Sequence, residues 1–158
     1  MAFPICDMCA STGMLCPGCE KKREQGMLTE TDVIVSKFLF QAGVKGYERL
    51  VESGGNLVII APKEQAPRII GYGGKTVKEL SRKVGKRAIV VEKEMGLKET
   101  VETLISPNRV IAINRLYKPD GSEVLKIVPA KSVQDEKIIN LVRDVIGAEV
   151  MKPDKPSN

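Results

Sequence analysis

The chain has 158 residues, of which 42% are hydrophobic and 28% are charged. This balance is that of a globular protein and excludes a disordered chain, and no apolar run approaches the length that spans a bilayer. The chain has only three Phe, three Tyr and no Trp, so we expect its hydrophobic cores to be aliphatic. So few aromatic residues also make it a poor candidate for binding nucleic acid through rows of stacked rings.

The formal charge of +5 is concentrated in one stretch of the chain. Between Arg68 and Lys93 there are eight basic residues and two acidic ones, so this stretch alone carries +6 and the remainder sums to −1. The eight cations are Arg68, Lys75, Lys78, Arg82, Lys83, Lys86, Arg87 and Lys93. Such concentration indicates an anionic partner at one place, although a charged helix face is more often only solvated.

The first 26 residues contain every cysteine of a chain that has no histidine. They form two Cys-x-x-Cys pairs, at Cys6, Cys9, Cys16 and Cys19. Two such turns that face each other supply the four thiolates that tetrahedral zinc prefers. The segment is too short to bury a core of its own, so we expect metal binding to supply its folding free energy.

A disulfide pair or a redox dithiol would use the same four cysteines. No charged-then-apolar signal segment opens the sequence, so we expect a reducing, cytoplasmic location in which stable disulfides are rare. A thioredoxin-like dithiol would need a βαβ unit, which the pattern lacks. The sequence therefore favours zinc, and four cysteine ligands leave no open coordination position for catalysis.

The following elements are expected next, in chain order. Apolar spacing, turn residues and glycine stops predict a helix from Thr29 to about Gly43, strands at Tyr47–Val51 and Asn56–Ala61, a short helix at Lys63–Ile70, a helix from Lys75 to Gly85, and a strand at Arg87–Glu92. The second half repeats most of this order without a glycine loop. It is expected to contain a helix at Leu97–Ile105, strands at Arg109–Tyr117 and Glu123–Val128, a helix at Val133–Ile146 and a strand at Ala148–Met151.

The glycine-rich turn between two predicted helices is the segment with the clearest binding chemistry. In Ile70-Gly71-Tyr72-Gly73-Gly74-Lys75, glycines allow another chain to come close, and the first amides of the next helix attract phosphate. The positive charges of Lys75 and Lys78 are unfavourable at the start of a helix, but they attract a phosphate ligand. A Gly-x-x-Gly turn also occurs in many helix-helix connections that bind nothing.

Apolar-Ile-Gly-x-x-Gly-Lys, followed by a helix and a β-branched strand, resembles the KH domain, whose Gly-x-x-Gly loop grips single-stranded nucleic acid. The extra helix and strand ahead of that core are similar to the type II form found in NusA-like transcription factors and archaeal relatives. The resemblance implies RNA binding by Ile70, Gly71, Tyr72, Gly73, Gly74, Lys75, Lys78 and Arg82. It also implies that Ile69, Ile70, Val77 and neighbouring aliphatic residues line a base-facing groove.

The patterns predict an α+β protein with a four-cysteine zinc knuckle (1–26), and the resemblance implies that it is of archaeal type and has two type II KH domains of order αββααβ. The first would span 27–95, the second, degenerate one 96–152, and 153–158 would be a loose tail.

The resemblance implies a cytoplasmic protein that binds single-stranded RNA, with RNA polymerase or the ribosome as partner complexes; single-stranded DNA stays open. An enzyme is not expected, because the chain lacks histidine and Gly74-Lys75-Thr76 has no glycine at the position that a P-loop requires. The alternative is a protein-interaction adaptor that uses the zinc knuckle and the second KH-like domain.

Overall fold

The structure, a computed structural model, describes residues 3–150. The predicted tail at 153–158 and the end of the last predicted strand lie outside these residues. The chain divides into two compact units, which we describe separately. Unit 1 comprises Met1–Leu50 and Leu57–Glu94, and unit 2 comprises Val51–Asn56 and Met95–Asn158.

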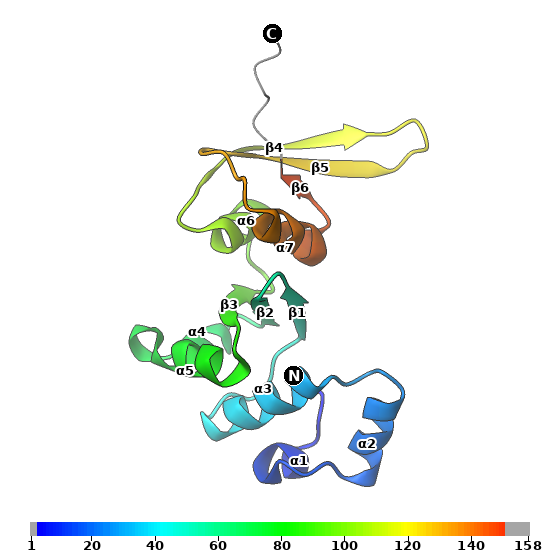
Figure 1. The fold of residues 1–158 in the computed structure, drawn as a ribbon, viewed down its shortest axis with the longest axis vertical. Coiled ribbons are helices and arrows are strands. Elements are labelled where there is room, and N and C mark those ends of the chain that lie inside the picture. Colours follow the sequence, from blue (N-terminus) through cyan, green and yellow to red (C-terminus); the bar gives the residue numbers. More distant parts are fainter. Residues whose placement is uncertain (1–2, 151–158) are drawn as a thin grey trace. The chain divides into compact units, whose positions relative to one another are not determined.

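From Asp7 to Glu92 the chain forms two short helices and then the predicted succession of elements (Figure 1). The elements are α1 (Asp7–Thr12), α2 (Pro17–Glu24), α3 (Glu30–Gln41), β1 (Arg49–Ser53), β2 (Asn56–Ala61), α4 (Ala66–Ile70), the 3-10 turn η1 (Tyr72–Gly74), α5 (Lys75–Val84) and β3 (Arg87–Glu92). The strands pair in the order β1-β2-β3. The predicted order of helix, strand, strand, helix, helix and strand is therefore confirmed, with β1 displaced two residues along the chain from its predicted position.

The core of unit 1 is mostly aliphatic, as the composition predicts, and also contains the rings of Phe3 and Tyr47. It is formed by buried side chains from α3, β2, α4 and α5, namely Val35, Leu39, Leu57, Ile59, Ile69 and Leu80. The segment ahead of α3 enters the same core through Phe3, Ile5, Cys9 and Cys19, and the ring of Phe3 lies edge-on to Tyr47 at 5.8 Å. The cysteine segment thus shares its hydrophobic core with the rest of unit 1.

A hydrogen-bond network fixes the start of α3 to the approach to β1. Thr29 and Asp32 form a capping box, in which each side chain accepts from the other residue's backbone N–H at 3.1 Å. The second carboxylate oxygen of Asp32 accepts the hydroxyl of Tyr47 at 2.8 Å, and Tyr47 also bonds the buried hydroxyl of Ser36 at 3.2 Å. Burial raises the pKa of Tyr47 above its ordinary value.

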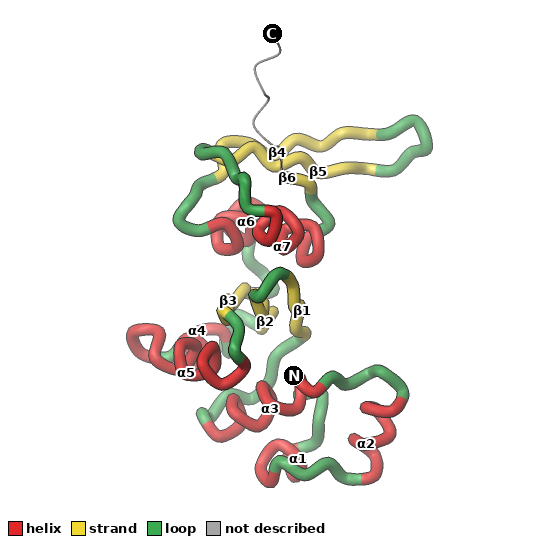
Figure 2. The backbone as a smooth tube through the Cα atoms, in the orientation of Figure 1, coloured by secondary structure: helices red, strands yellow, loops and turns green. Residues whose placement is uncertain are grey.

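Unit 2 consists of two helices that lie side by side on one face of a three-stranded sheet (Figure 2). Its elements after Met95 are α6 (Leu97–Ile105), β4 (Val110–Tyr117), β5 (Glu123–Pro129), α7 (Glu136–Ile146) and β6 (Glu149–Val150). In the sheet order β4-β5-β6, β5 pairs antiparallel with β4 and parallel with β6. The predicted hairpin is confirmed, whereas α7 begins three residues later than predicted because Asp135 caps it by accepting the N–H of Lys137 at 2.9 Å.

Among residues 3–150, none of the helices combines the length and the apolar character that a membrane crossing requires.

Replacing Tyr47 by Phe should lower the free energy of unfolding by about 1–2 kcal/mol, because Ser36 and Asp32 lose their shared partner in a buried site. The raised pKa means that the folded state favours protonated Tyr47. Its contribution is complete below the ordinary tyrosine pKa of about 10 and is lost as the pH rises above it. Urea unfolding between pH 7 and 11 measures both effects.

The matched control is Tyr117→Phe, because that ring is 73% exposed. It should change the free energy of unfolding by less than about 0.5 kcal/mol. Equal effects of the two substitutions would show that the Tyr47 network does not stabilise unit 1.

Candidate nucleic-acid interface and cysteine cluster

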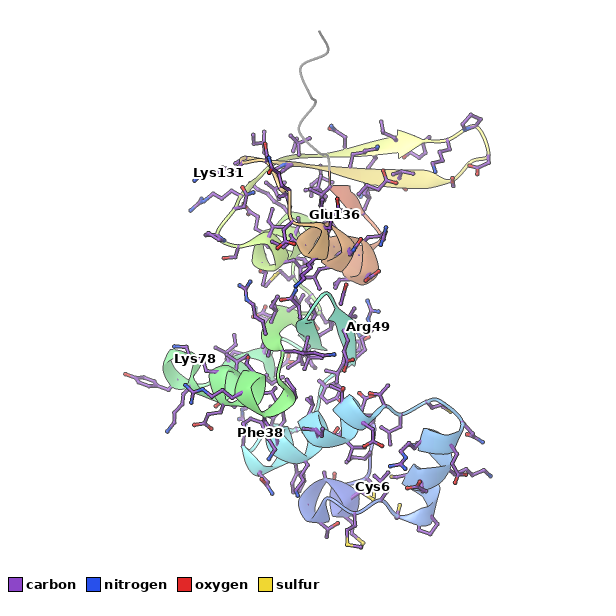
Figure 3. All side chains as sticks on the ribbon, in the orientation of Figure 1. Cys6, Phe38, Arg49, Lys78, Lys131 and Glu136 are labelled. Carbon is purple, nitrogen blue, oxygen red and sulfur yellow. The ribbon has the colours of Figure 1, made fainter. Side chains whose placement is uncertain are left out.

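The four cysteine sulfurs gather at the first turns of α1 and α2. Cys6 and Cys16 are the N-cap residues of these helices, and Cys9 and Cys19 are the third residues inside them. An N-cap side chain and the third helical residue lie on the same side of the first turn, which is the geometry of a capping box. All four sulfurs lie within 4.8 Å of one another, with Cys9 and Cys19 buried (Figure 3 labels Cys6).

Hydrogen bonds from backbone amides to cysteine sulfurs connect the start of α1 to the start of α2. The N–H of Cys6 donates to Sγ of Cys19 at 3.4 Å, and the N–H of Cys16 donates to Sγ of Cys9 at 3.1 Å. Each N-cap amide therefore supports the buried sulfur of the other helix. Hydrogen bonds of this kind stabilise a thiolate more than a thiol.

The clustered thiols shift one another's pKa in opposite directions. The N–H of Cys19 and the neighbouring thiols lower the pKa of Cys16 to about 6. The N–H of Cys16 acts to lower the pKa of Cys9, but burial and the adjacent thiols outweigh it and raise that pKa to about 12. Four thiolates this close require a cation, so the cluster could hold a metal ion. All four cysteines are free in the structure, and Sγ of Cys6 lies 3.2 Å from Sγ of Cys9.

The glycine loop, Gly71–Gly74, connects the end of α4 to the start of α5. Gly71 has φ 76° and ψ 173°, Gly73 and Gly74 have φ of 62° and 77°, and Tyr72 begins the short turn η1. A Cβ on Gly71 would collide with the side chain of Thr76 and lie 2.9 Å from its backbone nitrogen. A Cβ on Gly73 would meet nothing within 4 Å. Glycine is therefore required for space at Gly71, while at Gly73 only the backbone angle favours it.

The start of α5 has no side-chain cap and carries exposed positive charge. Gly74 is its N-cap and provides no side-chain hydrogen bond to the first turn. Lys75, Lys78 and Arg82 are exposed, and among the described residues none of them forms an ion pair (Figure 3 shows Lys78 on the outer side of α5). An uncapped helix start with unpaired cations attracts phosphate groups.

Two other cations of the basic stretch have a structural partner, whereas Arg68 and Arg87 are exposed and form no ion pair within residues 3–150. Lys93 pairs with Glu48 at 3.1 Å, and the ammonium group of Lys83 lies 5.9 Å from the ring centroid of Phe38. Lys93 and Lys83 are therefore less available to an anionic partner than the unpaired cations Lys75, Lys78 and Arg82 of α5.

Not every predicted site residue lies on this surface. Ile70 is 39% exposed beside the loop and Val77 is half-buried, but Ile69 is fully buried in the core of unit 1. The prediction that Ile69 lines a base-facing groove is wrong, because its side chain packs inward. Sequence reasoning also missed Thr76, whose side chain fills the space beside Gly71; its only signal was its place directly after Gly74-Lys75.

Comparisons with known proteins agree with this geometry. Residues 56–114 match the family model described as KH domain, a range that runs from β2 through the glycine loop and β3 into β4. A solved structure titled "Crystal structure of APE1850" has the same fold over 74% of this chain and 92% of its own, with a TM-score of 0.52 and 22% sequence identity. No curated protein matches the chain. The chain thus contains a KH domain, which supports a role in nucleic-acid binding.

Proposed function

We propose that this chain binds single-stranded RNA through the glycine loop and the first turns of α5. The observation that carries the proposal is that the matched KH segment contains an uncapped helix start beside three cations, Lys75, Lys78 and Arg82, that pair with no acid in the described part of the chain. Loop amides and these cations would hold successive phosphates. Bases would then lie over the aliphatic strip formed by Ile70 and Val77.

Zinc is the metal that we propose for the cysteine cluster. Four sulfurs at a Zn–S distance of about 2.3 Å form a tetrahedron with edges of about 3.8 Å. The sulfur of Cys6 lies 3.2 Å from that of Cys9 and 3.9 Å from that of Cys16, and all four sulfurs fall within 4.8 Å of one another, so small shifts of the side chains would form this tetrahedron. The ion would be structural, since all four coordination positions are filled by protein.

Unit 2 is proposed as a second, degenerate KH domain. Its order of helix, strand, strand, helix and strand repeats the order from α3 to β3 with one helix fewer, and its strands also pair in sequence order. It lacks the glycine loop, so RNA contact would rest on unit 1. By resemblance to tandem KH proteins of the NusA type, we propose a non-enzymatic, cytoplasmic factor of archaeal type that acts in transcription elongation or termination, or on ribosomal RNA.

An adaptor function is the second candidate, and one observation favours it. Met8, Met14 and Met27 come from the cysteine segment and the residues that follow it, and are 71%, 78% and 69% exposed. Exposed methionines adapt their shape to protein surfaces. In this reading the cysteine segment and unit 2 dock a partner, and the glycine loop is only a tight turn.

Introducing negative charge into the loop should abolish RNA binding. Gly73→Asp/Gly74→Asp is the suitable variant, because a Cβ finds space at both positions and Asp tolerates positive φ better than most residues. The matched control is Gly73→Asn/Gly74→Asn, which has the same shape and backbone strain without the charge. Fluorescence anisotropy with a random single-stranded RNA pool should show a loss of at least about tenfold for the Asp pair relative to the Asn pair. Equal affinities of the two pairs would rule out the loop as the phosphate site.

A salt titration in the same assay tests the cations. Lys75→Ala should weaken binding and reduce the slope of log affinity against log salt by about 0.7, the value for one single-strand phosphate. Lys98→Ala is the matched control, because Lys98 is also exposed in the first turn of a helix with a glycine N-cap, α6. Absence of RNA binding by the unmodified protein would favour the adaptor instead.

Removing the metal should destabilise unit 1. The purified chain should carry one zinc ion, and a chelator should lower the melting temperature of unit 1 by at least about 10 °C, because Cys9 and Cys19 belong to its core. Cys19→Ser should carry no zinc and melt like the chelated protein, whereas Met8→Ser, an exposed position on α1, should retain it. Identical melting with and without metal would contradict a structural zinc site.

A further inference from the structure

The most exposed aromatic side chain of this protein lies at the tip of the glycine loop. Of the three Phe and three Tyr, four rings are buried or half-buried, all in unit 1. Tyr72, in contrast, is 99% exposed. Within the described residues its hydroxyl forms no hydrogen bond and its ring meets no other ring or cation. Tyr72 therefore contributes nothing to the packing of unit 1, and the fold does not account for an aromatic residue here.

We infer that the ring of Tyr72 is a stacking site for a nucleobase of the bound single strand. This inference rests on the proposed RNA binding and adds a base contact to a loop that otherwise holds only phosphate. The ligand that such a site takes is the flat face of a purine or pyrimidine, in a strand whose bases are not paired.

The surroundings of Tyr72 leave its ring open to a base. Gly71 and Gly73 flank it and carry no side chains, and a Cβ built at Gly73 would meet no atom within 4 Å. The ring is thus accessible next to the point where the backbone of a bound strand would pass. Ile70, 39% exposed on the other side of Gly71, offers a second apolar surface close by in the chain.

Charge decides which part of a nucleotide meets the ring. The face of an aromatic ring carries negative potential, which repels a phosphate and accepts the face of a base by offset stacking. Lys75 and Lys78, which follow in α5, attract the phosphates of the same strand. An aromatic ring next to unpaired cations is the combination that single-strand binding proteins use, and alanine substitution of such rings costs roughly 5- to 150-fold in affinity per base.

Three substitutions separate stacking from the other contacts that Tyr72 could make. Tyr72→Phe keeps the ring and removes the hydroxyl, Tyr72→Ser keeps a hydroxyl and removes the ring, and Tyr117→Ser removes an exposed ring from β4 of unit 2 as a matched control. The zinc-loaded full chain is titrated with a labelled single-stranded RNA and with a ribose-phosphate strand of the same length that lacks bases.

If the inference holds, Tyr72→Ser weakens binding of the RNA by at least about fivefold, with an unchanged salt slope because no charge is lost. Tyr72→Phe and Tyr117→Ser stay within about twofold of the unmodified protein, and Tyr72→Ser binds the base-free strand as well as the unmodified protein does. Equal RNA affinity of Tyr72→Ser and the unmodified protein overturns the stacking site. An equal loss on both strands, or a loss in Tyr72→Phe as large as in Tyr72→Ser, overturns it too, because the contact would then be to the backbone.

The Gly73→Asp/Gly74→Asp variant keeps Tyr72 and so separates this inference from the proposed function. Binding that is lost in that variant but unaffected by Tyr72→Ser would leave the phosphate site standing and remove only the stacking site. Absence of RNA binding by the unmodified protein would overturn both.

Discussion

The close approach of Gly71 to Thr76 is the constraint on which the candidate site depends. Gly71 has no Cβ, and any other residue would collide with Thr76 at this point. The four residues Gly71–Gly74 are therefore enough to connect the end of α4 to the start of α5. The buried side chains of Ile69 and Leu80 anchor the two helices in the core on either side of the turn. The turn thus brings the start of α5, which has no side-chain cap, and its cations to one exposed place.

The cysteine cluster and the glycine loop belong to one compact unit. Phe3, Ile5, Cys9 and Cys19 lie in the same hydrophobic core as Leu39 of α3 and Leu80 of α5. A metal bound by the cysteines would therefore stabilise the scaffold that positions the loop, although the two sites do different chemistry. Hydrogen bonds among Thr29, Asp32, Ser36 and Tyr47 also connect α3 to the segment that precedes β1.

Much of the fold could be predicted from the sequence because glycines mark the ends of several elements. The bounds of α5, β3 and α6 follow directly from apolar spacing between Gly74, Gly85, Gly96 and Ser106-Pro107. The cysteine spacing likewise predicted one cluster. The helices α1 and α2 were not foreseen, since six and eight residues carry too weak a periodic signal.

Side-chain direction in short elements was the main thing that the sequence could not provide. In Ile69-Ile70 the pattern does not say which side chain turns inward, and the five-residue helix α4 buries Ile69 and exposes Ile70. The full exposure of Tyr72 is equally invisible in the sequence, because it depends on where three glycines turn the backbone. The match of residues 56–114 to the KH family model agrees with the predicted loop but starts at β2, later than the domain start expected from the type II pattern.

The most direct test of RNA binding at the glycine loop is a residue-by-residue NMR titration. Backbone amide resonances of the zinc-loaded chain would be followed while a short single-stranded RNA is added. The account predicts that amides from Ile70 to Lys78 shift first and together, with little change in α7 or β6. Shifts confined to unit 2 or to the cysteine segment, with the loop amides unmoved, would contradict it.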